Sequence, residues 1–549
     1  MGQGLRGDAG FLKIDLLGLG MLSAVEECVV SLAEQGSSVD LSRIPLDDPG
    51  VYAEIQAADT VGVFQIESRA QMQMLLRTQP QDLDDLVVEV ALVRPGPIQG
   101  GAVHPYIQRR LARRADPAFP IPYDHPLLAE ALAETLGVIV FQDQVLAVAE
   151  ALAGFSPGQA EELRRAMSRR RSEAAMRAQW DAFRDGAAAK DVPEHIAALV
   201  FEKILAFSAF GFPKAHSAAF ALLAYQSAWL RRYHPAAFLC SLLNAQPMGF
   251  YPPASLIRDG QRRDVEVLPP DVTRSAALCR LEDGAVRVGL GYVNGLGAEG
   301  AAAVVAERER NGDFTDGRDL ATRLSLKTDA LERLVASGAC DPLGPRRRLL
   351  WELGLAARPV SVRGGHRQLA LDLGLGTVPA LPEPGAWDLL VADYAHTGLS
   401  LREHPIAHVR RDLIDVVSSA DLKTLPNGAR ITIPGLAIAR QRPASANGVV
   451  FLLLEDEHGL TNLILMPDVY QRFRLLARTE PLLLATGTLE RRDRNINVQV
   501  ELLEPLETPG RRTIGGRGRS RGRTAAAAVQ DLRAVAPPAM HFAQGRRRA

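Results

Sequence analysis

Arginines gather in one short stretch of this chain in a pattern suited to binding phosphate. The segment "LRRAMSRRR", residues 163–171, holds five arginines within eight residues, beginning with Arg164 and Arg165. On a helix these side chains fall on two neighbouring faces. Guanidinium groups can bind two phosphate oxygens at once, so such a surface suits a triphosphate or a nucleic-acid backbone. A solvated charged helix is the alternative, although surface helices usually mix charges and here Glu161 and Glu162 lie only at the N-terminal end.

A carboxylate interrupts an apolar segment close to the start of the chain. Residues 11–20, "FLKIDLLGLG", predict a buried strand that runs into a glycine turn. Asp15 shares one face of that strand with Phe11 and Lys13. A carboxylate just before the turn indicates a chemical role, and that role needs partner residues. A strand so near the start has few partners for pairing, so we expect the ordered start of this domain to lie upstream.

Two further sites combine polar residues or glycines with the start of a helix. Lys214 and His216 precede an apolar helical segment, but no base or nucleophile stands beside them, and an isolated histidine is more often structural. Gly295-Leu296-Gly297 directly precedes another predicted helix. This turn is similar to a helix-hairpin-helix, in which backbone N–H groups at a helix N-terminus face a DNA phosphate. Ordinary turns between helices also contain glycine.

The elements that position these residues change along the chain. Residues 21 to about 270 show the three-and-four spacing of apolar residues that is typical of helices. Ser156-Pro157-Gly158-Gln159 predicts a serine N-cap, and we expect that helix to continue through residue 183. Residues 285–345 predict small helical hairpins, and residues 358–386, rich in Gly, Pro and Leu, predict a linker.

The C-terminal third has the pattern of a β-barrel. From about residue 429 there are three β runs, a short helical segment and two further β runs, which is the order of an OB-type barrel. Such barrels bind single strands or sugars, and a protein–protein module remains the alternative. Residues 509–549 predict a disordered basic tail. Its six arginines in 511–523 would either hold nucleic acid or keep the protein soluble.

Composition excludes several classes of protein. The 549 residues are 47% hydrophobic with a formal net charge of −1, so sizeable cores can form and total charge indicates no partner. The four cysteines form no CxxC pair, which argues against a disulfide framework and a cysteine zinc site. The sequence shows no signal peptide and no apolar run long enough for a membrane span. We therefore expect a cytoplasmic, multidomain protein that binds nucleic acid; the reaction is undetermined at this level.

Several long motifs, in register along residues 10–505, closely resemble the bacterial C-family DNA polymerases, relatives of the replicative polymerase III alpha subunit. The motifs are "FLKIDLLGLGML", "GVFQIESRAQM", "EVALVRPGPIQGG", "GVIVFQDQVLAVAEALAGFSPGQAEELRRAMSRRR", "FGFPKAHSAAFALLAYQSAWLRRYHPAAF", "LVASGACDPLG" and "TGLSLREHP". The segment "LLNAQPMGFYPPASLIRDGQRRDVEVLPPDV" is similar to the error-prone, lesion-bypass branch.

This resemblance implies roles for particular residues. Asp15 matches one of three palm aspartates that hold two Mg²⁺ ions for phosphoryl transfer. The other two form a D-x-D pair that we expect upstream of this chain, because Asp82 and Asp84 lie at a helix start. The resemblance places Arg164 and Arg165 at the incoming triphosphate. It implies nucleotide or template contact for Lys214 and His216, and DNA contact for Gly295 and Gly297.

The resemblance also implies a domain order and partners. We expect an α+β chain in this order: 1–20 palm remnant, 21–270 mostly helical fingers, 271–357 helix-hairpin-helix region, 358–428 linker and connecting segment, 429–508 OB fold, and 509–549 disordered basic tail. The function implied is error-prone, DNA-directed DNA polymerase in translesion synthesis and DNA repair, acting on primer–template DNA and deoxynucleoside triphosphates.

Two expectations qualify that function. This chain, with one palm carboxylate, is expected to be N-terminally truncated and inactive alone, and the alternative is a non-catalytic DNA-binding or interaction protein. A Y-family-like accessory protein is an expected partner. "QLALDL", residues 368–373, resembles the sliding-clamp peptide of replicative relatives but has Asp372 in place of an aromatic residue, so clamp binding should be weak. An ordinary linker is the alternative for this segment.

Overall fold

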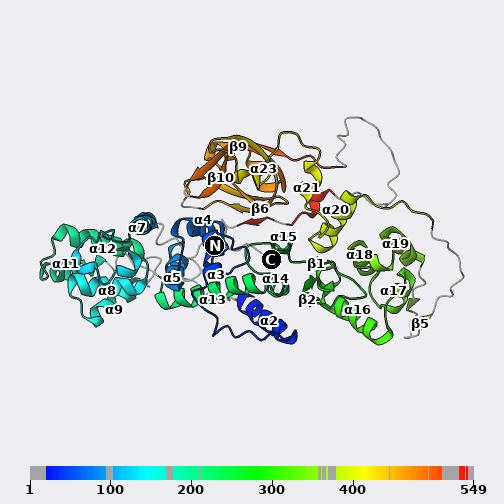
Figure 1. Cartoon of the computed structure of the whole chain (residues 1–549), viewed down its shortest axis with the longest axis horizontal. Coiled ribbons are helices and arrows are strands. Elements are labelled where there is room, and N and C mark those ends of the chain that lie inside the picture. The colour runs from blue at the N-terminus through cyan, green and yellow to red at the C-terminus, as the bar shows by residue number, and fades with distance from the viewer. Residues whose placement is uncertain are drawn as a thin grey trace.

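The structure is a computed structural model that places a β-barrel over the middle of an elongated helical body (Figure 1). It describes residues 20–93, 103–167, 177–208, 212–355, 360–361, 367–368, 379–443, 446–492, 494–509, 531–537 and 539–541. Asp15 and residues 369–373 of the clamp-like segment lie outside the described residues. Within the described ranges no helix is long and apolar enough to cross a membrane.

The central body consists of helices from the first half of the chain. These are α2 (Gly20–Glu34), α3 (Pro49–Gln56), α4 (Arg69–Thr78), α5 (Leu83–Leu92), α7 (Val103–Ala115), α13 (Lys214–Tyr233), α14 (Pro235–Asn244) and α15 (Pro253–Gln261). The long helix α13 packs on α5, and α14 packs on α2. Small residues allow α13 to approach α5 closely, since Ala221 and Ala224 of α13 are fully buried.

A second group of helices forms a lobe at one end of the molecule (Figure 1). It contains 3-10 turns at Pro126–Leu128 and Ala133–Thr135, and helices α8 (Gln142–Ala153), α9 (Pro157–Met167), α11 (Trp180–Ala188) and α12 (Glu194–Ser208). Its own core includes the tilted aromatic pairs Trp180–Phe201 and Phe183–Phe201. The predicted single helix through residue 183 is wrong at its end. Residues 178–179 form a turn, and α11 begins at Trp180. The side chains of Trp180 and Phe183 on α11 both pack in this core.

The helix-hairpin-helix region lies at the opposite end (Figure 1). A small sheet in the order β1-β3-β2 precedes it, with β1 (Val267–Leu268), β2 (Arg280–Glu282) and β3 (Ala285–Arg287). The region contains α16 (Gly297–Asn311), α17 (Gly317–Arg323), α18 (Thr328–Ala336) and α19 (Arg346–Leu355), with 3-10 turns at Leu290–Tyr292 and Asp341–Leu343. These helices share one core, which confirms the predicted helical hairpins.

The connecting segment contains regular elements of its own. The short strands β4 (Val360–Ser361) and β5 (Arg367–Gln368) pair antiparallel, so the first residue of the clamp-like segment belongs to a strand. Helices α20 (Ala386–Thr397) and α21 (Pro405–Arg410) and a 3-10 turn at Asp421–Lys423 follow. Both helices add apolar side chains to the central core, among them Leu390 and Ile406.

The barrel has the strand order predicted from the sequence. Its strands are β6 (Arg430–Gln441), β7 (Val450–Glu455), β8 (Leu460–Leu465), β9 (Leu482–Arg492) and β10 (Asn495–Pro505), with α22 (Pro467–Arg472) and α23 (Arg474–Thr479) between β8 and β9. The long strand β6 pairs with β9 through its first half and with β7 through its second half. Parallel pairing of β8 with β10 completes the closed barrel and confirms the OB-type fold.

Part of the expected disordered tail is ordered and returns to the barrel. Strand β11 (Met540–His541) pairs with β6 beside Ala439 and Arg440. The short helix α24 (Leu532–Val535) buries Leu532 completely, and Arg533 forms an ion pair with Glu480 at 2.7 Å. The composition of residues 509–549 could not predict this, because a few apolar anchors within a Gly/Arg/Ala-rich segment suffice for docking.

Candidate nucleic-acid and nucleotide interface

The arginine-bearing helix α9 starts with the cap that its sequence predicts. Ser156 Oγ accepts a hydrogen bond from Gln159 N at 3.4 Å, and Gln159 Oε1 accepts one from Ser156 N at 2.9 Å. This reciprocal pair satisfies two N–H groups that the helix itself leaves free. Ala160 and Leu163 face the core of the lobe. The cap and the buried face together fix which side of α9 presents its arginines.

The side chain of Arg165 forms an exposed, weak ion pair on that helix. Its Nε lies 3.2 Å from Glu161 Oε1, one helical turn earlier, and the arginine side chain is 66% exposed. An exposed pair at this spacing contributes only about 0.3–0.5 kcal/mol, so a phosphate could replace the carboxylate at little cost. Arg164 lies on the same helix, and its side chain is outside the described residues, as are residues 168–176 with the remaining arginines.

Lys214 and His216 occupy the first turn of α13 and have different surroundings. The backbone N of Lys214 donates to Asp143 Oδ2 at 2.8 Å, and its ammonium group forms an ion pair with Glu134. His216 is exposed and contacts Phe220 edge to face, with ring centroids 4.3 Å apart. Lys214 must therefore leave a carboxylate before it can reach a phosphate. The ring of His216 thus lies exposed at the start of α13, where a ligand could reach it.

The hairpin glycines adopt the backbone conformation for which glycine is suited. Gly295 and Gly297 have φ of +81° and +69°, and buried Leu296 between them anchors the turn. A Cβ on Gly295 would lie 3.0 Å from Cδ of Arg333, a side chain of α18. Nothing described lies within 4 Å of a Cβ built on Gly297, so this face of the turn is open to a ligand. The N-terminus of α16 opens there, as a phosphate-binding hairpin requires.

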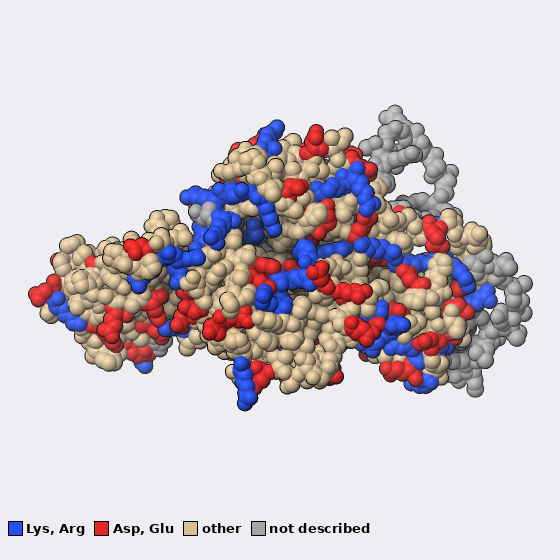
Figure 2. Space-filling view, in the orientation of Figure 1, with Lys and Arg blue, Asp and Glu red and all other residues tan. Residues whose placement is uncertain are grey.

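Sequence reasoning missed a group of cations between the body and the barrel. Partial burial lowers the pKa of the Arg114 guanidinium, and the positive charges of Arg110 and Arg494 lower it further. Arg114 lies at the end of α7, and Arg494 lies in the turn between β9 and β10. The run "RRLARR" at 109–114 was the available signal, and the fold brings it to the barrel. Figure 2 shows Lys and Arg side chains along the hollow below the barrel.

The barrel docks on α4 through specific side chains. Arg494 Nη1 donates to Gln79 Oε1 at 2.7 Å, and Gln73 Nε2 donates to Asn497 Oδ1 at 3.2 Å. Elsewhere, Ser255 of α15 donates to Glu455 Oε2 of β7 at 2.8 Å. These contacts place β7, β10 and the β9–β10 turn beside the body, so a strand of nucleic acid bound to that part of the barrel would also meet α4.

The described residues contain no group of three or more His, Cys, Asp or Glu side chains that could hold a metal ion. Asp15, the predicted ligand, lies outside them. Asp82 is the N-cap of α5, where its Oδ1 accepts from Asp85 N at 2.8 Å, and Asp84 lies in the first turn. Both are therefore helix-start residues, and no chemical step through a metal can be derived from the described part of the chain.

Two family models match separate parts of the chain. Residues 21–191 match the bacterial DNA polymerase III alpha subunit finger domain, and residues 264–350 match a helix-hairpin-helix motif. The first match spans α2 to α11 and therefore includes α9. The second spans the Gly295-Leu296-Gly297 turn and α16 to α19, which confirms the helix-hairpin-helix interpretation of that region.

Curated relatives match nearly the whole chain. It is 45% identical over 522 residues to the "Error-prone DNA polymerase" of Mycolicibacterium paratuberculosis, a match that covers 93% of this chain and 46% of the relative. Proteins of the same name from Anaeromyxobacter dehalogenans and Corynebacterium diphtheriae are 42% and 41% identical and are covered to 45% and 48%. This chain thus spans about half the length of the curated relatives it matches, and the resemblance inferred from its motifs is confirmed.

Proposed function

We propose that this chain, a relative of the bacterial error-prone DNA polymerases along nearly all of its length, supplies the nucleotide- and DNA-binding part of such a polymerase. The reaction would be template-directed addition of deoxynucleotides to a primer during translesion synthesis and repair. The observation that carries the proposal is the identity of 41–45% to those relatives over nearly the whole of a chain that matches the finger-domain and helix-hairpin-helix models.

The proposal assigns the incoming triphosphate to the helical lobe. Arg164 and Arg165 of α9 would bind its phosphates, and the weak hold of Glu161 on Arg165 supports this role. Lys214 and His216 would make further nucleotide or template contacts. Because Lys214 starts in an ion pair with Glu134, its contribution would be smaller than that of Arg165.

Duplex DNA is assigned to the helix-hairpin-helix region. The open N-terminus of α16 at Gly297 would donate backbone N–H groups to a phosphate, and Arg333 beside Gly295 would add a positive charge. The barrel and the exposed cations Arg114 and Arg494 would hold the unpaired template, whereas Arg110 is already paired with Asp85. Both assignments rely on backbone phosphates, so binding should weaken steeply with salt.

Mg²⁺ is the proposed metal, with Asp15 as one ligand. The chemistry that two Mg²⁺ ions supply in polymerases is activation of the primer hydroxyl and charge neutralisation on the triphosphate. The part assigned to the described residues is to orient that triphosphate. A cytoplasmic location, a Y-family-like accessory protein and weak contact with the sliding clamp complete the proposal.

A binding experiment separates this function from a non-catalytic DNA-binding role. The full chain is mixed with a fluorescent primer–template whose primer ends in a dideoxynucleotide, and dissociation is followed with each deoxynucleoside triphosphate in turn. A nucleotide-binding polymerase segment should hold the DNA longer with the nucleotide that matches the template. Equal retention with all four nucleotides would identify a DNA-binding module without nucleotide selection and would overturn the proposal.

Primer extension with Mg²⁺ tests the role of Asp15 separately. The expectation from the sequence is that the chain alone does not extend a primer. If extension occurs and Asp15→Ala abolishes it, Asp15 is a catalytic ligand and the prediction of inactivity is wrong. If Asp15→Ala leaves extension unchanged, Asp15 is not part of the reaction centre.

A further inference from the structure

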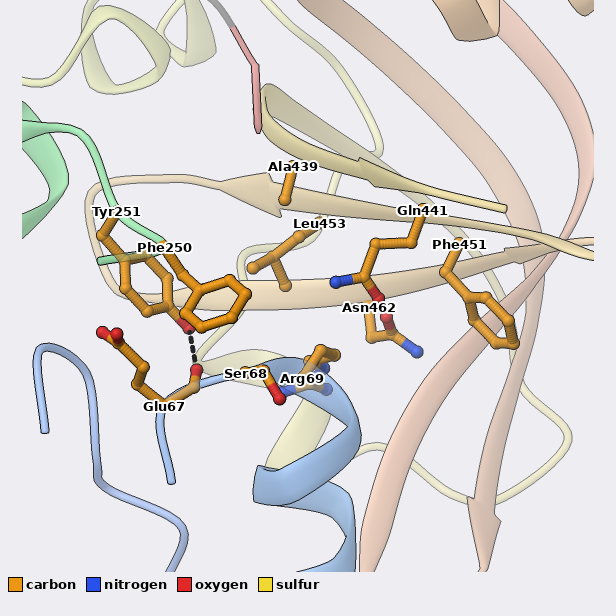
Figure 3. A pocket seen from close by; sticks show the side chains of 10 residues that line it. All are labelled: Glu67, Ser68, Arg69, Phe250, Tyr251, Ala439, Gln441, Phe451, Leu453 and Asn462. Atoms are coloured by element: carbon orange, nitrogen blue, oxygen red, sulfur yellow. Dashed lines mark hydrogen bonds between the residues drawn. The ribbon is translucent and has the colours of Figure 1, made fainter. Parts of the chain in front are cut away.

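A small hollow lies where the start of α4 meets the barrel strands β6 to β8 (Figure 3). Arg69, the first residue of α4, lines it from the body, and Gln441, Phe451 and Asn462 line it from the barrel. None of these side chains belongs to the nucleotide or hairpin sites described above. The hollow is therefore a distinct place where body and barrel jointly enclose polar groups.

Arg69 is partly buried, and none of the described residues forms an ion pair with it. Its Nε is sealed from solvent, and no hydrogen-bonding partner for it exists among the described residues. Burial lowers the pKa of the Arg69 guanidinium, which reflects the cost of leaving the cation in that place. Polar atoms that are sealed from water are normally hydrogen-bonded, so an arginine with a sealed, unpartnered Nε at the edge of a hollow suits an anion bound at the mouth.

Glu67 is the nearest acidic residue in the lining, and it does not supply that anion. Its carboxyl group accepts hydrogen bonds from the backbone of Gly62 and Phe250, and burial raises its pKa to about 8. In Figure 3 the carboxyl points away from Arg69, while the backbone carbonyl of Glu67 accepts from the Tyr251 hydroxyl at 3.0 Å. At neutral pH Glu67 is mostly protonated and leaves the positive charge of Arg69 uncompensated.

Two further features of the hollow suit an anion with oxygen atoms. Asn462 is 1% exposed and donates Nδ2 to Asn497 Oδ1 at 2.7 Å, yet its own Oδ1 has no partner among the described residues. That oxygen could accept directly from the proton of inorganic hydrogen phosphate, whereas with a phosphodiester, which has no proton, it would accept from a water shared with the ligand. The N-terminus of the ten-residue helix α4 also lies here, and its dipole favours negative charge.

The size of the hollow limits the occupant to one small group. The whole hollow measures about 330 Å³ including its open mouth, but its closed part, about 10 Å³, holds roughly one water. A whole nucleotide cannot enter, whereas one tetrahedral group can reach Arg69 from the mouth. Phe451, partly exposed on the barrel side, borders that mouth.

We propose that Arg69 is the cation of a phosphate-binding site between α4 and the barrel. The ligand is a phosphate group, either the phosphodiester of a single strand that runs along the barrel face or inorganic phosphate. Bound there, the phosphate neutralises Arg69 and joins the body to the barrel. This site does not depend on the proposed polymerase function, since its occupant needs no reaction.

The test compares thermal unfolding of the full chain with and without inorganic phosphate at constant ionic strength. Arg69→Met removes the charge with little change in volume. The matched control is Arg43→Met, because the Arg43 side chain is 86% exposed. We expect phosphate to raise the melting temperature of the unmodified chain and of the control but not of Arg69→Met. In phosphate-free buffer Arg69→Met should be no less stable than the unmodified chain, because an unpaired charge is lost.

A second variant keeps the test decisive if Arg69→Met folds poorly. Asn462→Asp places a carboxylate in the hollow, where it would pair with Arg69 and repel phosphate. This variant should lose the phosphate response while it keeps Arg69. An unchanged response in both variants would show that the hollow holds only a structural water and would overturn the proposal.

A single-stranded oligothymidylate of twelve nucleotides then distinguishes the two sources of phosphate. If a strand occupies the site, Arg69→Met should lower the slope of log affinity against log salt by about 0.7, the loss of one phosphate contact. If the slope is unchanged but the response to inorganic phosphate is lost, the ligand is the free ion. If Arg69→Met changes neither the salt slope nor the response to inorganic phosphate, the proposed site is contradicted.

Discussion

The arginines of α13 and those of α9 show how the same side chain serves opposite purposes. Arg231 of α13 is 5% exposed and donates to Asp59 Oδ1 at 2.8 Å and to Asp259 Oδ2 at 2.6 Å. Arg165 of α9 is 66% exposed and has one partner on its own helix, Glu161. The first joins α13 to α15 and to the turn after α3. The second is available to a ligand.

The difference lies in how many carboxylates face each guanidinium and how much water remains around it. Burial alone would raise the pKa of Asp59, but the adjacent Arg231 and Arg263 outweigh it and hold that pKa below its usual range. Within the described part of the chain, Arg165 has only the exposed pair with Glu161. An arginine-rich sequence is therefore ambiguous until the carboxylates around each arginine are known.

The largest expected effect comes from breaking the buried group. Arg231→Met should destabilise the central body by about 3 kcal/mol, because Asp59 and Asp259 lose their buried cation and keep only the more peripheral Arg263. Urea denaturation monitored by circular dichroism measures this. Arg232→Met, next along α13 and 36% exposed, loses its pair with Glu54 and its contact with the Tyr233 ring, and it should cost about 1 kcal/mol. Equal effects of the two substitutions would show that the buried ion pairs of Arg231 stabilise the fold no more than the exposed pair of Arg232.

The stability difference between the unmodified chain and Arg231→Met should depend on pH through Asp59. The folded-state pKa of Asp59 is lowered, so the stability from its pairing is present above the ordinary aspartate pKa and is lost as pH falls through the folded pKa. The stability gap between the unmodified chain and Arg231→Met should therefore shrink below about pH 4. A gap that widened with acid would contradict the assignment.

Arg165 should show the opposite profile, with a change in activity and none in stability. In an intact polymerase containing this segment, Arg165→Ala should lower kcat/KM for the nucleotide about thirtyfold, or about 2 kcal/mol, with nearly unchanged primer–template binding. Single-nucleotide incorporation kinetics measure this. The control is Glu161→Ala, which removes the ion-pair partner of Arg165 but keeps the positive charge of Arg165. Weakened DNA binding with unchanged kinetics would move Arg165 from the nucleotide to the duplex.

Glu67 extends the comparison to a buried acid that lacks a cation. Burial raises its pKa from 4.5 to about 8, so its ionisation should progressively destabilise the fold as pH rises between those values. Glu67→Gln cannot ionise, and its stability relative to the unmodified chain should rise from pH 5 to pH 8 and then level off. Denaturation midpoints at pH 5, 7 and 9 measure this, with the exposed Glu130→Gln as control. A flat difference would mean that Glu67 stays charged in the folded chain.

The smallest expected effect concerns the clamp-like segment. A peptide covering residues 365–376 should bind a bacterial sliding clamp weakly at best, because Asp372 occupies the position of an apolar anchor. Asp372→Phe should strengthen binding by restoring buried apolar area. Fluorescence anisotropy with both peptides measures the gain. Tight binding by the unmodified peptide, or no gain with phenylalanine, would disprove the clamp interpretation.

The sequence by itself determined the features that depend on near neighbours. The Ser156–Gln159 cap needs only four consecutive residues, and the turn at Gly295 and Gly297 needs only backbone freedom. The five barrel strands were recognisable because alternation and turn residues recur locally, and their order fixed the OB topology. The family followed from long motifs whose order along the chain is itself sequence information.

Only the tertiary structure decided which charges are satisfied. Arg231, Arg165 and Arg69 look alike in the sequence, yet their surroundings differ. Arg231 is buried among carboxylates, Arg165 is exposed, and Arg69 lines a hollow with Asn462 of the barrel, where its Nε has no partner among the described residues. Likewise, Arg494 reaches Gln79 only because the barrel docks on α4, and the tail pairs with β6 only because apolar anchors hold it there. Coulombic and hydrogen-bonding partners are set by distance in space, and packing between segments remote in sequence fixes that distance.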